Sequence, residues 1–386
     1  MKNIFSKIDK PLLFVTILLC GIGLLMVFSS SSIVAILRYG KTPTYFFFKQ
    51  VIFFSIAFVI GFIALKIPTK VYQSLSWLLI IGVLGLLVML LVYGKITNHA
   101  QSWFYVPGVN FALQPSEFAK SILILFMASF YSYLARIKSN NVYMYFVPLG
   151  VAFIIGVLIL MQPDFGSAAI LLGIAFCIFI SIPMIKGNIR KIMTIIVSAL
   201  VVLAISLLYS GTEILNSEQM SRFTFREPCQ RYKEKTGYQV CNGFIAINNG
   251  GLTGVGIGNS TQKYSYLPES HTDFIFAILV EELGLLVAII VLLLYAYMLY
   301  RILKIAKEAY TLRNSIIAYG VFWMFMFHIL INLSGMLALL PLTGVPLPLM
   351  SYGGSSTINF VVMLFITQRV AIENNTKKHE KELIEA

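Results

Sequence analysis

The sequence predicts an all-α integral membrane protein with ten transmembrane helices in one polytopic domain, residues 1–386. Its composition is 58% hydrophobic and only 12% charged, whereas an ordinary soluble domain carries about 25% charged residues. The mean hydropathy is +0.85. The hydrophobic residues gather into segments of ~20, the length that an α-helix needs to cross a bilayer.

These apolar segments follow one another with mostly short connections. The first comes after Lys10 and resembles the apolar part of a signal peptide, but its length and the spans that follow indicate an uncleaved helix. The fifth and sixth are short, and residues 162–167 separate them. One long polar loop, 211–272, precedes the eighth span, and a polar tail, 372–386, follows the last. The predicted spans are residues 11–30, 46–65, 74–94, 117–135, 144–161, 168–185, 192–210, 273–300, 315–340 and 353–371.

The basic residues are distributed asymmetrically between the connections. With the N-terminus in the cytoplasm, most of the 29 Lys and Arg fall in cytoplasmic segments, and few lie in the short outer connections. Because cytoplasmic loops carry the excess of Lys and Arg, both termini are predicted to be cytoplasmic and the long loop to face outward. The net charge of +13 is then a topology signal beside anionic lipid headgroups. It does not indicate a nucleic-acid partner, since no stripe of basic and aromatic residues accompanies it.

Carboxylates are rare in the first 210 residues, which contain only Asp9, Glu117 and Asp164. Glu117 and Asp164 each follow a Gln-Pro pair, and the predicted topology puts both at the outer end of a helix. Asp273 begins the eighth span at the same face. Ionisable groups at a membrane are costly and usually mark a substrate or ion path. We therefore expect these three carboxylates to belong to one site.

Each of these residues also has an ordinary structural interpretation, which stays open at this stage. The segment SHTD, 270–273, matches the S-x-x-D capping box, so Asp273 could act as a helix cap. Ser116 could cap the fourth helix, with Glu117 in its first turn. Glu117 and Lys120 are three residues apart and could neutralise each other. Asp164 fits ordinary turn chemistry.

Other polar features are expected to be mainly structural. Glu281 and Glu282 lie two turns into the eighth span, where at least one should face the interior, and His328 is interpreted as a satisfied polar contact. The segment PLTGVPLPLMSYGGSS, 341–356, is irregular backbone and predicts the floor or rim of a cavity. The segment GGLTGVGIGNS, 250–260, lacks the spacing of a nucleotide-binding motif. Its glycines suit tight turns, and a phosphate nest is the alternative.

Two of the four cysteines lie in the long loop. Cys229 and Cys241 are 12 residues apart, and no His accompanies them at the spacing of a zinc site. A loop outside the cell permits a disulfide between them, and two free thiols are the alternative.

Four segments resemble hallmark motifs of the SEDS family (shape, elongation, division, sporulation) of cell-wall synthases. They occur in the family's order over nearly the whole chain. The first of them is more similar to the division member of the family than to the elongation or sporulation members. The loop insert REPCQRYKEKTGYQVC and Ser265 depart from the family pattern. The four segments are GYQVCNGFIAINNGGLTGVGIGNSTQKYSYLPESHTDFIFAILVEELG (237–284), NFALQPSEFAK (110–120), MQPDFGSA (161–168) and GVPLPLMSYGGSS (344–356).

The resemblance implies a peptidoglycan glycosyltransferase that polymerises lipid II into glycan strands at the outer face of the bacterial cytoplasmic membrane. It would release undecaprenyl diphosphate, act in septal wall synthesis, and work at the division septum with a class B penicillin-binding protein and other divisome proteins. A lipid II flippase is the alternative. The resemblance assigns the catalytic carboxylate to Asp273, which we expect to act as general base. It assigns functional importance to Glu117, Lys120 and Asp164.

Further residues are expected to bind substrate or support the site. The leaving pyrophosphate needs positive charge or a divalent cation, Mg²⁺ or Mn²⁺, for which Glu117, Asp164 and Asp273 are the candidate ligands. Candidate cationic groups are Lys120, Lys263, Arg222, Arg226 and Arg231. The remaining supporting candidates are Glu269, His271, Ser351 and Ser355.

Overall fold

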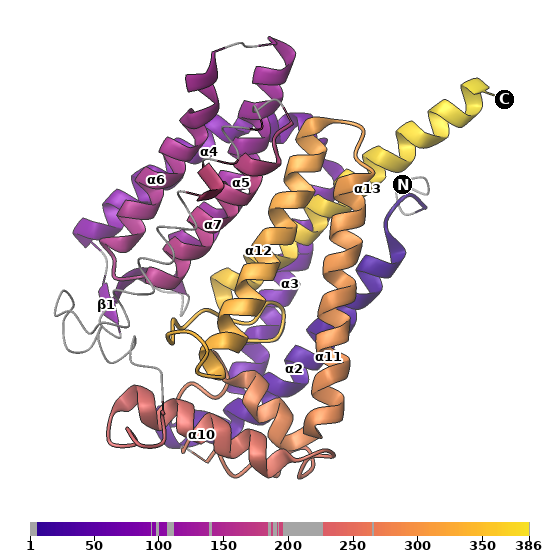
Figure 1. The fold of residues 1–386 in the computed structure, drawn as a ribbon. Coiled ribbons are helices and arrows are strands. Elements are labelled where there is room, and N and C mark those ends of the chain that lie inside the picture. Colours follow the sequence, from indigo (N-terminus) through magenta and orange to yellow (C-terminus); the bar gives the residue numbers. More distant parts are fainter. Residues whose placement is uncertain are drawn as a thin grey trace.

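The chain forms a bundle of long helices with a smaller layer across one end (Figure 1). The computed structural model describes residues 6–93, 95–97, 100–105, 112–138, 141–183, 187, 191, 193–195, 227–264 and 266–385. The helices in these ranges are α2 Lys10–Tyr39, α3 Tyr45–Lys66, α4 Thr69–Tyr93, α5 Pro115–Arg136, the 3₁₀ helix η1 Val142–Phe146, α6 Val147–Leu160, α7 Phe165–Ser181, α10 Lys235–Gly250, α11 Ile275–Lys307, α12 Leu312–Met336 and α13 Gly354–Glu385.

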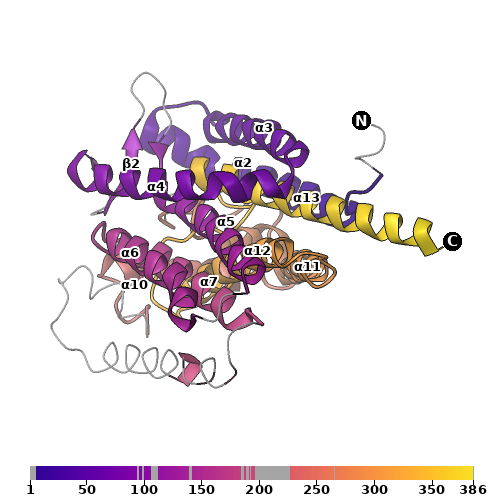
Figure 2. The same ribbon diagram turned by 90° about the horizontal axis from the view of Figure 1, so that it is seen from above.

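Nine of the ten predicted spans coincide with helices, and the predicted span 192–210 lies largely outside the described residues. In the described part of the chain, eight helical segments are long and apolar enough to cross a membrane, and α7 is a shorter apolar helix. The predicted polar tail, 372–386, is not separate from the last span, because α13 continues as a helix to Glu385. Lys and Glu are good helix formers, and Figure 2 shows α13 extending past the other helices.

The two ends of the chain meet at the end of the bundle opposite α10 (Figure 1). The Lys7 ammonium lies 3.3 Å from Thr376 Oγ1. The Asp9 backbone N–H donates to Gln368 Oε1 at 2.8 Å, and the Asp9 carboxylate pairs with Arg301 near the end of α11. The termini therefore lie on the same side of the protein, as the charge pattern requires.

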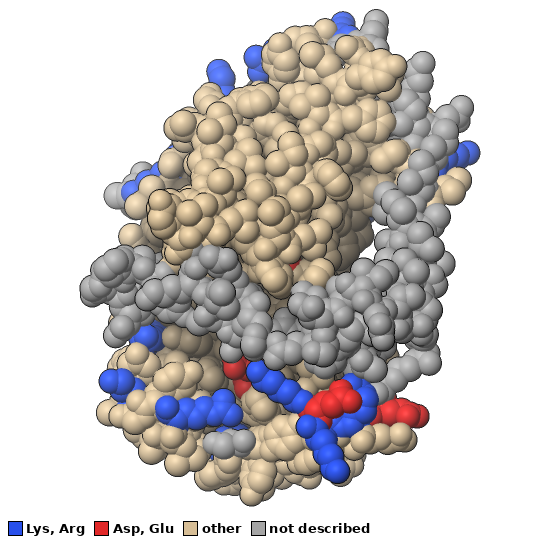
Figure 3. All heavy atoms as spheres, turned by 90° about the vertical axis from the view of Figure 1, so that its left-hand side faces the viewer, with Lys and Arg blue, Asp and Glu red and all other residues tan. Residues whose placement is uncertain are grey.

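The surface between the two ends is suited to lipid. Figure 3 shows a broad and almost uncharged face, with Lys and Arg along its rim and a larger group of charged side chains below it. On α6, Phe153 and Ile154 are 64% and 55% exposed, which in water would be an unfavourable apolar surface. Contacts inside the bundle use small residues: a Cβ added at Gly61 of α3 would collide with the Phe365 ring of α13.

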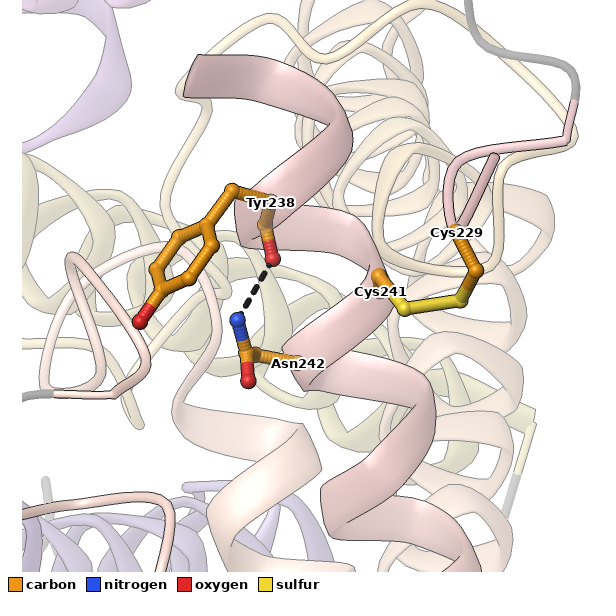
Figure 4. Close-up of a disulfide and its surroundings, with 4 residues drawn as sticks. All are labelled: Cys229, Tyr238, Cys241 and Asn242. Carbon is orange, nitrogen blue, oxygen red and sulfur yellow. Dashed lines mark hydrogen bonds between the residues drawn. A yellow bond between two sulfur atoms is a disulfide. The ribbon is translucent and has the colours of Figure 1, made fainter. Parts of the chain in front are cut away.

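The described part of the long polar loop, 227–264 and 266–272, contains structure that the hydropathy pattern does not predict. Helix α10 buries one face, including Val240 and Ala246, against the first part of α11. A disulfide joins Cys241 of α10 to Cys229, just ahead of the helix (Figure 4). A further difference from the all-helical prediction is a small antiparallel sheet in the order β1-β2-β3, formed by Lys95–Thr97, Ala100–Tyr105 and Ala112–Leu113.

Helix α11 is broken at Gly284, whose φ of 81° and ψ of 170° are not helical. The break would leave backbone groups unpaired, at a high cost in a membrane. The glycine-rich segment 250–256 pairs with them instead and so completes the helix. The bonds run from Val255 N to Glu281 O at 2.9 Å, Gly256 N to Glu282 O at 2.9 Å, Leu285 N to Gly251 O at 3.0 Å and Leu286 N to Leu252 O at 3.2 Å. The N–H groups of residues 255 and 256 thus serve the helix and do not form a phosphate nest.

Candidate functional site

Asp273 lies in a tight turn directly before α11. The backbone N–H groups of Thr272 and Phe274 both donate to Glu269 O at 3.2 Å, and Glu269 has a positive φ of 55°. The predicted capping box is wrong, because the N-cap of α11 is Phe274 and no side chain caps this helix. Ser270 is fully buried, and its hydroxyl donates to Ser30 O of α2 at 3.3 Å. Ser270 therefore anchors the turn, and Asp273 is not committed to capping.

A small, partly open cavity lies beside this turn. Its enclosed space of about 10 Å³ is close to that of one water molecule, so the cavity as it stands admits no more than a single small group of a substrate. It is lined by Asp273, by Ile331, Asn332 and Gly335 of α12, and by residues 342–345.

The irregular segment 341–353 forms one wall of the cavity, as the sequence predicts. Gly344 has a φ of 72°, and a Cβ added there would lie 3.4 Å from Asp273 Oδ2. The Ser351 hydroxyl donates to Thr272 O at 2.7 Å and accepts from Leu347 N at 2.9 Å. Ser351 thus fastens this segment to the turn that carries Asp273.

His271 packs on the other side of the turn. Its ring centroid lies 4.8 Å from that of Phe46 and 5.7 Å from that of Tyr352, and its carbonyl accepts from Tyr352 N at 2.9 Å. Burial lowers the pKa of His271 to about 4, and the nearby Arg38 also lowers it, against an opposing effect of Glu269. The imidazole is therefore neutral at physiological pH.

Glu117 and Lys120 form the predicted pair, deep inside the bundle. Lys120 Nζ lies 2.6 Å from Glu117 Oε1 and 2.9 Å from His328 Nε2 of α12, and all three side chains are buried. His328 Nδ1 lies 2.7 Å from Met324 O, so His328 is the satisfied polar contact that the sequence suggests. Asn359 of α13 donates to Glu117 O at 3.0 Å. The cluster therefore ties three helices together.

Asp164 is the N-cap of α7. Its Oδ1 accepts from Ser167 N at 3.0 Å, and its Oδ2 accepts from Gln114 Nε2 at 3.1 Å and from the Ser116 hydroxyl at 3.3 Å. The prediction that Ser116 caps its own helix is wrong, because the N-cap of α5 is Gln114 and no side chain caps it. Ser355 Oγ accepts from Gln114 N at 3.0 Å, which joins the start of α13 to this group.

Lys263 and the paired carboxylates at 281 and 282 form a second buried cluster. Lys263 Nζ lies 2.9 Å from Glu282 Oε1 and 3.3 Å from Ser29 Oγ. Glu281 binds Asn249, Ser260 and the backbone N–H of residue 261. Both glutamates hold the loop onto α11, which confirms the structural role predicted for them.

Asn332 connects the Asp273 turn to the rest of the bundle and was not singled out from the sequence. Its Nδ2 donates to Asp273 O at 2.9 Å and to Val345 O at 2.8 Å. His328 and Asn332 are four residues apart, so they share one face of α12. Two polar residues at this spacing in an otherwise apolar helix are the sequence feature that points to Asn332. Through α12, the Glu117–Lys120 cluster is linked to the cavity.

Several predicted groups stand apart from the cavity or beyond the described chain. Arg222, Arg226 and Ser265 lie outside the described residues. Arg231 pairs with Glu234 at 2.9 Å just before α10, and both side chains are partly exposed. Glu269 Oε2 accepts from the Thr272 hydroxyl at 2.8 Å.

The three candidate carboxylates, Glu117, Asp164 and Asp273, are not arranged to bind a divalent cation together. Among the described residues, no group of three or more His, Cys, Asp and Glu could hold a metal. Glu117 is engaged by Lys120, and Asp164 by three protein donors. These two carboxylates therefore do not fit a Mg²⁺ or Mn²⁺ site with Asp273.

Comparison with known proteins identifies clear relatives. The FtsW/RodA/SpoVE family model, described as "Cell cycle protein", matches residues 10–376. A Bacillus subtilis protein named "Probable peptidoglycan glycosyltransferase FtsW" is 36% identical, over 98% of this chain and 95% of its own. A protein of the same name from Tolumonas auensis is 35% identical, over 95% of this chain and 93% of its own.

Solved structures share the fold. A chain from a structure described as "Structural coordination of polymerization and crosslinking by a peptidoglycan synthase complex" gives a TM-score of 0.74 at 23% identity, over 95% of this chain and 98% of that one. The rod shape determining protein RodA of Thermus thermophilus gives 0.66 at 22% identity, over 94% of this chain and 96% of its own.

Proposed function

Because the chain belongs to the FtsW/RodA/SpoVE family of cell cycle proteins, we propose that it is a peptidoglycan glycosyltransferase that polymerises lipid II. The observation that carries this proposal is the position of Asp273, which lines a small cavity just before the start of α11. The curated relatives described above are named for this activity, which favours it over a lipid II flippase.

Asp273 acts as the general base in the proposed reaction. Its carboxylate accepts the proton of the GlcNAc 4-hydroxyl of the acceptor while that oxygen attacks C1 of the donor MurNAc. The new C1–O4 bond forms as the bond from C1 to the pyrophosphate oxygen breaks, and undecaprenyl diphosphate leaves with the bonding electron pair. Attack from the opposite face converts the α-linked donor into a β-linked product, as in other inverting displacements. Helix α11 begins two residues later, and its N-terminus favours a negative charge at Asp273.

The two buried lysines have supporting roles in this proposal. Lys120 and Lys263 are 0% and 3% exposed, and each is paired with a glutamate. A paired ammonium inside the protein is badly placed to meet a pyrophosphate, so these lysines hold α5 and the loop in position. Arg231 also pairs with a glutamate, Glu234, and stands apart from the cavity, so we assign none of the cationic candidates within the described residues to the leaving group.

The cellular role follows from the same relatives. We propose action in septal wall synthesis at the outer face of the cytoplasmic membrane, since the curated relatives carry the name FtsW. One of the related solved structures is of a peptidoglycan synthase complex that coordinates polymerisation with crosslinking. That likeness supports a class B penicillin-binding protein as the transpeptidase partner, with other divisome proteins around it.

The test is polymerisation of lipid II by the purified protein with a candidate transpeptidase, with and without Mg²⁺ or Mn²⁺. Asp273→Asn keeps the shape of the side chain and removes the base, so polymer formation should fall by about 10²–10⁴-fold. Ser270→Ala is the matched control, because it weakens the anchor of the same turn and leaves the carboxylate. Asp273→Asn polymerising as fast as the wild type contradicts the base assignment. Lipid II flipping without polymer, measured in liposomes, contradicts the enzyme itself.

A further inference from the structure

The side-chain amide of Asn332 has a fixed orientation. Both of its N–H groups donate to backbone carbonyls, one of Asp273 at 2.9 Å and one of Val345 at 2.8 Å. A carbonyl oxygen only accepts hydrogen bonds. Rotating the amide by 180° would set Oδ1 against both carbonyls. The Oδ1 atom therefore points away from these two carbonyls.

That Oδ1 atom is buried and lacks a hydrogen-bond partner among the described residues. Asn332 is only 6% exposed, and a buried polar atom without a partner is uncommon enough to require a reason. Its side chain lines the same cavity as Asp273. Asn332 and Asp273 therefore line the same cavity and are joined by the hydrogen bond from Nδ2 to Asp273 O.

We propose that Asn332 is a substrate-binding residue of the glycosyl transfer, whose Oδ1 accepts a hydrogen bond from a hydroxyl or acetamido N–H of the acceptor sugar. The inference rests on the proposed function. The acceptor GlcNAc carries both kinds of donor close to its reactive 4-hydroxyl. Asn332 binds one of them while the 4-hydroxyl faces Asp273.

The geometry supports this assignment over a purely structural one. Holding the Asp273 turn to the 342–345 wall requires only Nδ2, and Nδ2 already makes both contacts. A purely structural role would leave the Oδ1 acceptor buried without a hydrogen-bond partner, which is unfavourable. A donor on the bound substrate would satisfy Oδ1. A site with such an acceptor discriminates against ligands that lack the hydrogen-bond donor.

Two substitutions separate the two ends of the amide. Asn332→Ala removes the acceptor and the donors together. Asn332→Asp keeps an oxygen at the Oδ1 position but sets its second carboxylate oxygen against the carbonyls of Asp273 and Val345, so it breaks the contacts that Nδ2 makes. The control is Ser351→Ala, which loosens the same turn from Thr272 O at a residue that does not line the cavity.

The experiment measures lipid II binding to the purified full-length variants, together with polymerisation and thermal unfolding. A neutral hydrogen bond contributes a net factor of about 2- to 12-fold, so Asn332→Ala should weaken lipid II binding by that amount. Asn332→Asp should unfold at a lower temperature than Asn332→Ala, and Ser351→Ala should weaken lipid II binding less than Asn332→Ala does.

The outcomes distinguish this inference from the proposed function. Equal lipid II binding by wild type and Asn332→Ala, with polymer from both, overturns the Asn332 assignment alone. Equal losses in Asn332→Ala, Asn332→Asp and Ser351→Ala also overturn it, because they show that only the loop contact matters. A wild type that neither binds nor polymerises lipid II overturns the proposed function and this inference with it.

Discussion

The break in α11 makes Gly284 a position where one methyl group should be strongly destabilising. Its backbone has φ 81° and ψ 170°, a region that only glycine populates readily. A Cβ added there would come closer than 3.0 Å to Leu252 O and Gly254 N. These are backbone atoms of the segment that completes the helix, so they cannot move aside without losing their own bonds.

The cost of Gly284→Ala can be estimated from two contributions. The strained backbone adds about 1–3 kcal/mol. Displacing the loop breaks roughly half of the four bonds between segment 250–256 and α11, at a net ~0.5–1.5 kcal/mol each. The free energy of unfolding should therefore fall by about 2–6 kcal/mol. Polymerisation should fall as well, because residues 275–283 carry the turn of Asp273.

The assay is thermal unfolding in detergent or lipid nanodiscs, with Gly82→Ala as the matched control. Gly82 lies within α4, and a Cβ added there meets nothing within 4 Å. Alanine at that position should be neutral or stabilise the helix by up to ~1 kcal/mol. If Gly284→Ala and Gly82→Ala unfold at the same temperature, segment 250–256 does not complete the helix and the reasoning fails.

Three further predictions concern other parts of the structure. Replacing Cys229 and Cys241 by serine should lower the free energy of unfolding by up to about 3 kcal/mol, the entropy of closing so short a loop, and reductant should then affect the wild type alone. Lys120→Met leaves the Glu117 carboxylate buried without its cation, which should cost about 3–5 kcal/mol in denaturation experiments; adding Glu117→Gln should restore part of that loss. Burial lowers the pKa of His271 to about 4 from an unfolded value of about 6.5, so stability should decline as the pH falls through that interval. His271→Phe, which retains the ring contacts, should show a smaller decline in melting temperature across the same pH range.

Local properties of the sequence account for the positions of the spans. An apolar run of the length of α3 or α12 is sufficient to predict a membrane helix, whatever its neighbours are. Counting spans predicts that Glu117, Asp164 and Asp273 lie at the same face. The importance of Asp273 came from motif resemblance, because one carboxylate before an apolar helix is equally typical of a cap.

The contacts of those residues depended on the tertiary structure. Ser270 looks like a cap in the sequence, yet its hydroxyl reaches Ser30 of a helix 240 residues away. Lys263 looks like an available cation, yet it is paired with Glu282 inside the protein. Glycines 250–256 look like a loop, yet their backbone completes a broken helix.

The reason is the environment of a membrane helix. Lipid and protein interior are both apolar, so hydropathy along a span does not show which face is buried or what lies opposite. Composition and periodicity therefore determined that this chain crosses the membrane and roughly where. Only the packing of helices distant in the sequence decided that Asn332 would bond to the Asp273 turn beside the cavity, because its partners are backbone carbonyls on other segments of the chain.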